Sequence, residues 1–304
     1  MHYRPVAYSE SIASMVGGEP RRGVVHSAFD GAANILFPGA WMLSLNACTS
    51  PRMPNGLHLA VRAGAFPFSA LRAGMPVLLG AQRLHIEAIG CSLDLSQAPH
   101  WDPHIYQHEC LDMEIITHNA GRLHDLVDEG SPRDGMIYRG APQGDRKGSP
   151  VHITMPSDVV ALARYLCGRG VGLTPAGDDM LAGWMAAGWL MYGPLPWFLE
   201  ACQSIIAVAM QQTHLLSQAW LRCAADGNVA LPVVALLEAL AREDVAQLER
   251  AARGVLALGA TSGHDLIRGL LLCLQGWPEI HCQAQHQCQP GWSGEREEER
   301  GAWE

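Results

Sequence analysis

Short apolar runs follow one another through the first ninety or so residues, and each is closed by glycine, proline, asparagine or aspartate. Runs of this length between turn residues are typical of β-strands. The absence of helical stretches of ten or more residues between them favours antiparallel pairing over a parallel, doubly wound sheet. We therefore predict a small antiparallel barrel or sandwich-like domain. Its expected strands are RGVVHSAF, AANILF, AWMLSL, GLHLAV, PVLLG and QRLHIEAI.

The apolar pattern changes to a helical period of 3.6 residues from Pro156 onward. This change predicts a helical bundle after the strands, so the expected fold class is α+β. One further amphipathic helix is expected before the change, over 115–128. The later helices are expected from a cap at Ser157 to about Cys167, from the paired aspartates at 178 and 179, over 197–225, over 232–241, over 244–258, and from Asp265 to about Leu274.

Glycine, proline and charged residues fill the segment 129–150 and predict a connector. We place a domain boundary at about residue 150. Residues 1–150 then form the β-rich domain, and residues 151–288 form the helical domain. The polar, acidic segment 289–304 predicts a disordered tail.

Two related segments precede expected helices. GRGVGLTPAGDDMLAGW, residues 168–184, contains five glycines, a proline and two adjacent aspartates. GATSGHDLIRGL, residues 259–270, is a shorter echo. In both, a loop with glycine and threonine ends in an aspartate, and a glycine follows four residues later. The echo predicts two loops of one design that open two helices of the same bundle.

A loop that ends at a helix N-terminus has the properties of an anion site. The first backbone N–H groups of a helix lack intrahelical partners, and the helix dipole is positive there. Glycine lets the backbone approach a ligand closely, and threonine adds a hydroxyl donor. We therefore expect a small anionic substrate to contact Gly172, Thr174, Pro175, Gly177, Thr261, Ser262, Gly263 and Asp265. Thr213 on the third helix joins this set, as does Asn55 or Asn46 if the two domains close on each other.

The adjacent carboxylates Asp178 and Asp179 are the candidate catalytic residues. An aspartate at a helix start is a favoured cap that contributes about 1 kcal/mol, which explains one of them without a ligand. The second carboxylate then contacts solvent, a base, a Mg²⁺ ion, or the amide of a substrate. From the residues alone, capping and ligand binding have even weight, and Mg²⁺ is the only cofactor that this pair suggests.

Composition and charge exclude several classes of function. With 48% hydrophobic and 17% charged residues, the chain is apolar for a protein without a membrane span, which favours association with partners. A net charge of −9 excludes nucleic acid and anionic membrane as partners. Nine scattered cysteines without a C-x-x-C pair, and an N-terminus without a signal peptide, favour reduced thiols in the cytoplasm.

The common catalytic signatures are absent from the sequence: it has no G-x-S-x-G elbow, no H-E-x-x-H helix and no P-loop. His104 and His108 are four residues apart, near Cys110 and His118. The proline and aspartates around them do not predict a helix, so this spacing does not predict a metal site. The histidines and cysteines over 281–288 fall near the expected tail.

GLTPAGDDMLAG, followed by QTHLLSQAWLRCAADG and GATSGHDLIRGLL, is similar to the AllH-like family. The resemblance covers the C-terminal half well and the N-terminal half only in its run of short strands. It departs from expectation at His264 and Arg268, where smaller or apolar residues are expected. The family includes a subunit of oxamate carbamoyltransferase in anaerobic allantoin degradation, a branch of purine catabolism. The resemblance implies carbamoyl transfer between oxamate and phosphate, through carbamoyl phosphate, in a complex with other subunits.

Three hypotheses follow. The first is a cytoplasmic subunit or relative of a carbamoyltransferase that binds carbamoyl phosphate, oxamate or phosphate at the two loops. The second is a stand-alone Mg²⁺-assisted hydrolase or lyase that uses Asp178 and Asp179. The third is a non-catalytic scaffold whose aspartates only cap a helix.

Overall fold

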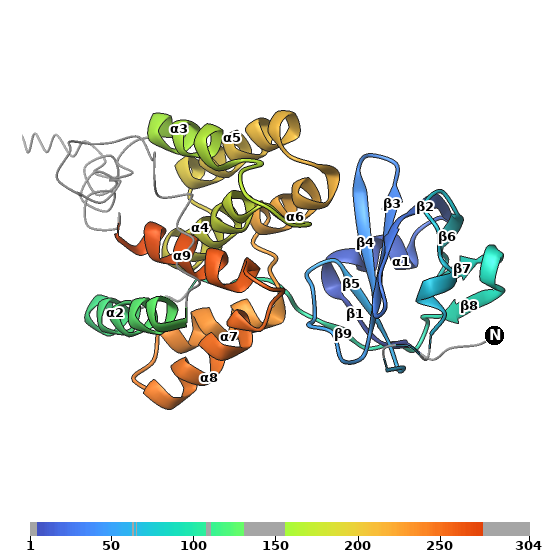
Figure 1. Cartoon of the computed structure of the whole chain (residues 1–304), viewed down its shortest axis with the longest axis horizontal. Helices are drawn as coiled ribbons and strands as arrows, with labels where there is room; N and C mark the ends of the chain where they lie inside the picture. The colour runs from blue at the N-terminus through green and yellow to red at the C-terminus, as the bar shows by residue number, and fades with distance from the viewer. Residues whose placement is uncertain (1–4, 63, 65, 108–110, 131–155, 276–304) are drawn as a thin grey trace, which may run out of the picture.

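The computed structural model describes residues 5–62, 64, 66–107, 111–130 and 156–275 of the chain. Figure 1 shows these residues as a sheet lobe followed by a helical lobe, which confirms the predicted α+β fold. The expected connector over 129–150 lies almost wholly outside the described residues, as do the expected tail, His108, Cys110 and the histidines and cysteines over 281–288.

The sheet lobe is one nine-stranded sheet with the order β8-β7-β6-β2-β3-β4-β5-β1-β9. It curls into a half-barrel (Figure 1). Its strands are β1 (Pro5–Ser9), β2 (Arg21–Ala28), β3 (Ala32–Phe37), β4 (Trp41–Ala47), β5 (Gly56–Leu59), β6 (Pro76–Gly80), β7 (Arg83–Ile86), β8 (Cys91–Asp94) and β9 (His100–Trp101). Short helices connect them: η1 (Glu10–Ile12), α1 (Ala13–Gly17), η2 (Phe68–Ala70) and η3 (Glu87–Ile89).

The expectation of a purely antiparallel sheet is wrong for two pairs. β4 pairs with β5 in parallel, and β1 pairs with β9 in parallel. A parallel neighbour requires the chain to return to the same end of the sheet, usually through a helix. Here residues 48–55 make that return as an irregular segment. The apolar pattern of the strands contains no sign of this connection, which later forms one wall of a cavity.

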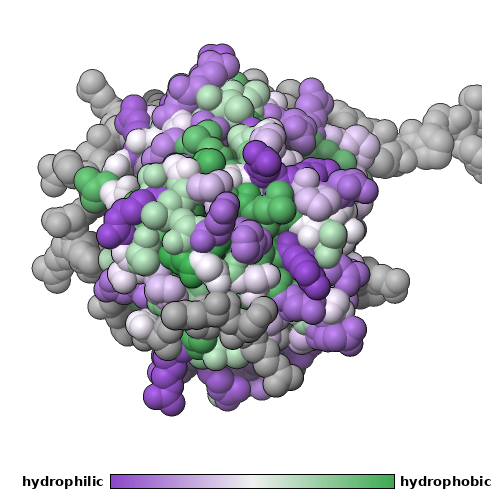
Figure 2. Space-filling view, turned by 90° about the vertical axis from the view of Figure 1, so that its right-hand side faces the viewer, coloured by the Kyte–Doolittle hydropathy of each residue, from purple (hydrophilic) through white to green (hydrophobic). Residues whose placement is uncertain are grey.

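The concave side of the sheet holds one hydrophobic core. In β2, Val25 is buried while Val24 is 40% exposed, the alternation expected of a strand with one covered face. The core continues onto α1 through Met15 and Val16. The outer face of β3 and β4 instead contacts the helical lobe, where Met42 packs with Leu216 and Ala219. On the end of the sheet lobe seen in Figure 2, hydrophobic residues are interspersed with hydrophilic ones.

The helical lobe is built around α4, which is buried along almost its whole length. α2 already belongs to this lobe, because Ile116, Leu123 and Val127 join the same core. In the described residues no helix is both long and apolar enough to cross a membrane. The helices are α2 (Met113–Gly130), α3 (Pro156–Leu166), α4 (Ala176–Tyr192), α5 (Pro196–Gln212), α6 (Leu215–Ala225), α7 (Leu231–Leu240), α8 (Val245–Leu256) and α9 (Ser262–Gln275).

The single helix expected over 197–225 is wrong, because Thr213 and His214 have extended backbones and separate α5 from α6. Tertiary contacts hold this break. The Thr213 hydroxyl donates to Asp178 at the start of α4, and Gln218 Nε2 donates to the Thr213 carbonyl at 2.7 Å. The apolar period runs on through the break and therefore gives no sign of it.

α4 and α9 cross with their backbones in direct contact. A Cβ on Gly183 would collide with the carbonyl oxygen of Leu266, and a Cβ on Gly269 would collide with that of Met180. The two contacts are reciprocal: each helix places the glycine of its motif against the residue that follows the motif aspartate of the other. The echo seen in the sequence is thus a local two-fold arrangement of two loop-helix units.

Candidate functional site

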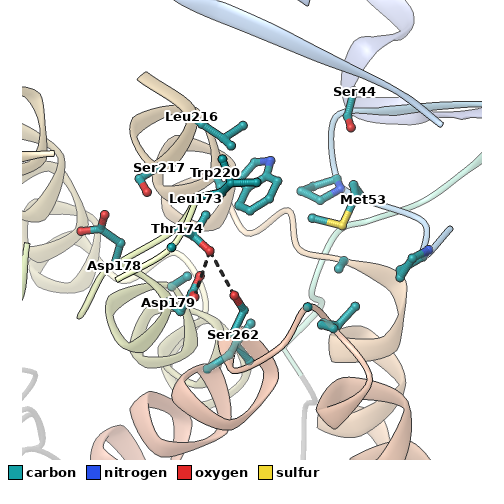
Figure 3. A pocket seen from close by; sticks show the side chains of 18 of the residues that line it. Ser44, Met53, Leu173, Thr174, Asp178, Asp179, Leu216, Ser217, Trp220 and Ser262 are labelled. Carbon is teal, nitrogen blue, oxygen red and sulfur yellow. Dashed lines mark hydrogen bonds between the residues drawn. The ribbon is translucent and has the colours of Figure 1, made fainter. Parts of the chain in front are cut away.

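A cavity of about 520 Å³ lies between the sheet lobe and the helical lobe. β3, β4 and residues 50–54 form one wall, and the loops before α4 and α9 form the other. One side of α6 and residues 228–230, just before α7, complete the helical wall. Figure 3 shows Ser44 on the sheet side, opposite Thr174, Trp220 and Ser262 on the helical side. The two glycine-threonine loops therefore open into one space.

The two loops meet through their hydroxyl groups. Thr174 Oγ1 donates to Asp179 Oδ2 at 3.1 Å and lies 3.0 Å from Ser262 Oγ (Figure 3). A hydroxyl has one proton, so Ser262 donates to Thr174 when Thr174 donates to Asp179. Asp179 and Thr174 are each 8% exposed, and both line the cavity. The result is a chain of hydroxyls that leads from the second loop to the carboxylate of the first.

Asp178 has a different environment from its neighbour. Its Oδ1 accepts from the Gly168 N–H at 2.8 Å, and its Oδ2 accepts from the Thr213 hydroxyl. It is 2% exposed, and Figure 3 shows its carboxylate directed away from Asp179. Asp178 thereby ties the end of α3 and the end of α5 to the start of α4. It is a positioning residue.

The capping alternative for the paired aspartates is wrong. The N-cap position of α4 is Pro175, and no side chain caps this helix. Asp178 and Asp179 lie within the first turn of the helix, where Asp178 binds a backbone N–H from outside it. The cap expected at Ser157 concerns a side chain outside the described residues, and the described part of α3 begins at Pro156.

Burial, together with the negative charges of Asp265 and Asp178, raises the pKa of Asp179 from its usual value to about 7. Hydrogen bonds from Ser262 and Thr174 favour the ionised form and partly oppose this effect. A carboxyl group with a pKa near neutrality accepts and returns a proton efficiently at physiological pH. Asp179 thus has the position and the acidity of a general base.

Asp265, the aspartate of the second loop, is 5% exposed and does not line the cavity. Burial raises the pKa of its carboxyl, and Arg268 at 3.1 Å opposes that rise. Arg268, which departs from the pattern expected for this loop, therefore neutralises the second aspartate. Of the two motif aspartates, Asp179 is the one that faces the cavity.

The structure places the other candidate residues as follows. Gly172, Thr174, Thr261 and Ser262 line the cavity. Gly177 and Gly263 pack on the carbonyl oxygens of Leu166 and Val255, at the ends of the preceding helices, and Pro175 is the N-cap of α4. Thr213 lies behind the cavity and binds Asp178.

Asn55 is not brought to this cavity. Its amide donates to the Met42 carbonyl at 2.8 Å, and its side chain lines a second cavity of about 450 Å³. Asn46, the other asparagine considered, does line the candidate site and donates to the Ser44 carbonyl at 2.9 Å.

Several lining residues were missed by the sequence reasoning. Ser44 is 4% exposed on a strand that is otherwise mostly apolar, a signal that a buried polar residue requires an explanation. Ser217, 1% exposed, and Trp220 line the cavity from α6. Within the described part of the chain, neither the Ser217 hydroxyl nor the Trp220 N–H has a hydrogen-bond partner. Orphaned donors of this kind are expected where a ligand supplies the acceptor.

The charges around the cavity are unusual for an anion site. Among the described lining residues there is no lysine, arginine or histidine, and the only ionisable side chains are Asp178 and Asp179. The described residues also contain no group of three or more histidine, cysteine, aspartate or glutamate side chains able to hold a metal ion. Helix N-termini and hydroxyl groups therefore supply the positive potential that this part of the chain offers.

Comparison with known proteins gives two matches that together cover most of the chain. Residues 166–274 match the family model described as oxamate carbamoyltransferase subunit AllH. Residues 4–100 match the model described as the AllH family N-terminal domain. No solved structure matches the chain. The first match includes both glycine-threonine loops and α4 to α9 almost to its end, and the second covers the sheet up to the start of β9.

Proposed function

Because the chain belongs to the AllH family of oxamate carbamoyltransferase subunits, we propose that it binds a small anionic reactant of carbamoyl transfer in the cavity between its lobes. Membership of a subunit family implies other subunits. The candidate reactants are carbamoyl phosphate, oxamate and phosphate, and the candidate pathway is allantoin breakdown in the cytoplasm.

The donor groups that line the cavity support the binding of an anion or a polar carbonyl. The positive ends of the α4 and α9 dipoles lie at the cavity, and Thr174, Thr261 and Ser262 add hydroxyls from the same loops. The N–H groups of Gly177 and Gly263 already donate to the carbonyls of Arg169 and Leu258, so the side-chain hydroxyls are the more available donors. Ser217 adds a buried hydroxyl that has no hydrogen-bond partner among the residues that the structure describes. Such donors are held by packed helices, so binding a ligand costs little reordering.

The proposed reaction is the attack of the oxamate nitrogen on the carbonyl carbon of carbamoyl phosphate. A C–N bond forms, the C–O bond to phosphate breaks, and the nitrogen loses one proton. Asp179 accepts this proton, and in the reverse direction it returns the proton as phosphate attacks. Hydroxyl and backbone donors at the loops stabilise the negative charge that develops on the carbonyl oxygen.

A Mg²⁺ ion held by the aspartate pair is less well supported than proton transfer. Both oxygens of Asp178 already accept hydrogen bonds, from Gly168 and Thr213. A metal ion bridging the pair would have to break these bonds, which hold the start of α4 in place. We therefore assign the chemistry to Asp179 and leave the metal-dependent hydrolase as the weaker alternative.

The single observation that carries the proposal is the placement of Asp179 in the cavity at the end of the Ser262 and Thr174 hydroxyls. Asp179→Asn removes the proton acceptor while keeping the shape of the side chain. We expect a loss of at least about 100-fold in the rate of carbamoyl transfer by the assembled enzyme. Asp125→Asn, at an exposed aspartate on α2, is the matched control and retains full activity. Wild-type activity in Asp179→Asn would refute the assignment.

A further inference from the structure

This inference rests on the proposed function. If the cavity binds the proposed anionic reactants, the described lining residues do not balance their negative charge. The first turns of α4 and α9 line the space, and each helix start contributes about +0.5 of a charge. The carboxylates of Asp178 and ionised Asp179 outweigh that amount. A phosphoryl group has about −2 at neutral pH, and oxamate adds its own carboxylate. The described residues alone leave this charge uncompensated.

Basic residues lie close in sequence to the lining residues, but their side chains bind groups outside the cavity. Four arginines of the described residues lie within two positions of a lining residue along the chain. The Arg52 guanidinium lies over the Trp101 ring, that of Arg169 lies over the Tyr165 ring, Arg222 donates to the carbonyls of Gly39 and Ala40, and Arg268 pairs with Asp265. None of the four lines the cavity.

The rim of the same cavity is apolar and exposed. Val171 is 88% exposed, Leu173 is 58% exposed and Phe29 is 39% exposed, and all three line the cavity. Val171 and Leu173 stand on the loop that also contains Thr174. Large apolar side chains exposed together around a polar site are typical of a protein-protein contact. An apolar rim around an acidic, cation-free space fits a partner with an apolar contact surface and a basic residue at its centre.

We infer that another subunit docks on Val171, Leu173 and Phe29 and places an arginine or lysine side chain into the cavity beside the bound phosphate. The basic side chain balances the charge of the phosphoryl group and stabilises the charge that moves onto it as the C–O bond breaks. An arginine supplied in trans is an effective way to do this, because it arrives only when the complex has formed. Transfer then depends on assembly.

The inference is tested in the purified, assembled enzyme with the photoreactive residue p-benzoylphenylalanine in place of Val171. We expect a cross-link to a different subunit, within a peptide that contains arginine or lysine, and substitution of that basic residue should reduce transfer at least about 100-fold. The control site is Tyr106, which is 66% exposed and does not line the cavity. A cross-link to a second copy of this chain, or no cross-link at all, would overturn the inference.

A second experiment introduces a cation at the rim of the cavity by substitution within this chain. We expect the isolated wild-type chain to bind inorganic phosphate weakly, and Leu173→Arg to lower the dissociation constant at least about tenfold at low salt. Leu173→Gln, similar in size but uncharged, should leave it unchanged. Binding of phosphate by the isolated chain as tightly as by the assembled enzyme would also overturn the inference. Absence of carbamoyl transfer in the assembled wild-type enzyme would instead refute the proposed function, so the two failures are distinguishable.

Discussion

Asp178 and Asp179 are neighbours in sequence, and their side chains contact different parts of the molecule. Asp178 binds the Gly168 N–H and the Thr213 hydroxyl, just beyond the ends of α3 and α5. Asp179 binds Thr174 at the cavity wall. Adjacent residues in the first turns of a helix point about 100° apart, so one can hold the structure together while the other faces a ligand.

The hydrogen bond between Thr213 and Asp178 is expected to contribute to stability. Thr213→Val keeps the branched shape of the side chain and removes its hydroxyl donor. The loss leaves one oxygen of a buried carboxylate without its partner, and we expect the free energy of unfolding to fall by about 1–3 kcal/mol. Unfolding of the isolated wild-type and variant chains in guanidinium chloride measures this change in the free energy of unfolding. An unchanged midpoint would show that this bond does not hold α5 to α4.

The raised pKa of Asp179 makes a prediction about pH. The folded state keeps the proton up to about pH 7, whereas the unfolded chain releases it near 3.8. The folded state therefore binds more protons in between, and its stability falls as the pH rises from about 4 to about 7, by about 1.4 kcal/mol per pH unit at most. Asp179→Asn should remove this dependence and be more stable than wild type above pH 7.

Urea unfolding of wild type and Asp179→Asn at intervals between pH 4 and pH 8 checks this sign. Asp265 also has a raised pKa and remains in both proteins, so the difference between the two curves isolates Asp179. Parallel curves for the two proteins would mean that Asp179 keeps the ordinary acidity of an aspartate.

At the scale of elements, the crossing of α4 and α9 fixes the two loops relative to each other. Gly183 and Gly269 allow the backbones to touch, and this contact brings Thr174 within 3.0 Å of Ser262. Gly183→Ala places a methyl group against a backbone carbonyl, so we expect a loss of at least about 2 kcal/mol in the free energy of unfolding. Gly121→Ala, in α2 with open space around it, is the control and should gain about 0.5–1 kcal/mol.

Thermal unfolding of the two variants under identical conditions compares them directly. A Gly183→Ala protein as stable as Gly121→Ala would mean that the helices do not need this close approach. The expected order is wild type between the two variants.

Most helices, and the pairing of the two loops, could be predicted from the sequence because these features are local patterns. The echo of Asp179 and Gly183 in Asp265 and Gly269 predicted two loops of one design, whereas their two-fold arrangement is seen only in the helix contacts. The break at Thr213 could not be predicted, because a bond to Asp178, far along the chain, stabilises it. The parallel β4–β5 pair was missed for the same reason, since strand patterns do not encode the path of a connection.

For the whole molecule, the cavity is a property of two lobes that come together, and it is the part least accessible from sequence. Ser44 on β4 and Ser217 on α6 lie far apart in the chain, and they line opposite walls of the cavity. Asn46 was considered on the condition that the domains close on each other, and it does line the cavity. Asn55 satisfied the same sequence argument and lines the other cavity, because its amide binds Met42.

The central claim is that the reactant binds between the lobes at the two loops, and its location can be measured directly. A crystal structure of the assembled enzyme with carbamoyl phosphate or oxamate should show the ligand in the 520 Å³ cavity, within hydrogen-bond distance of Thr174, Ser217 or Ser262 and beside Asp179. A ligand bound at saturating concentration elsewhere, with this cavity empty, would contradict the account.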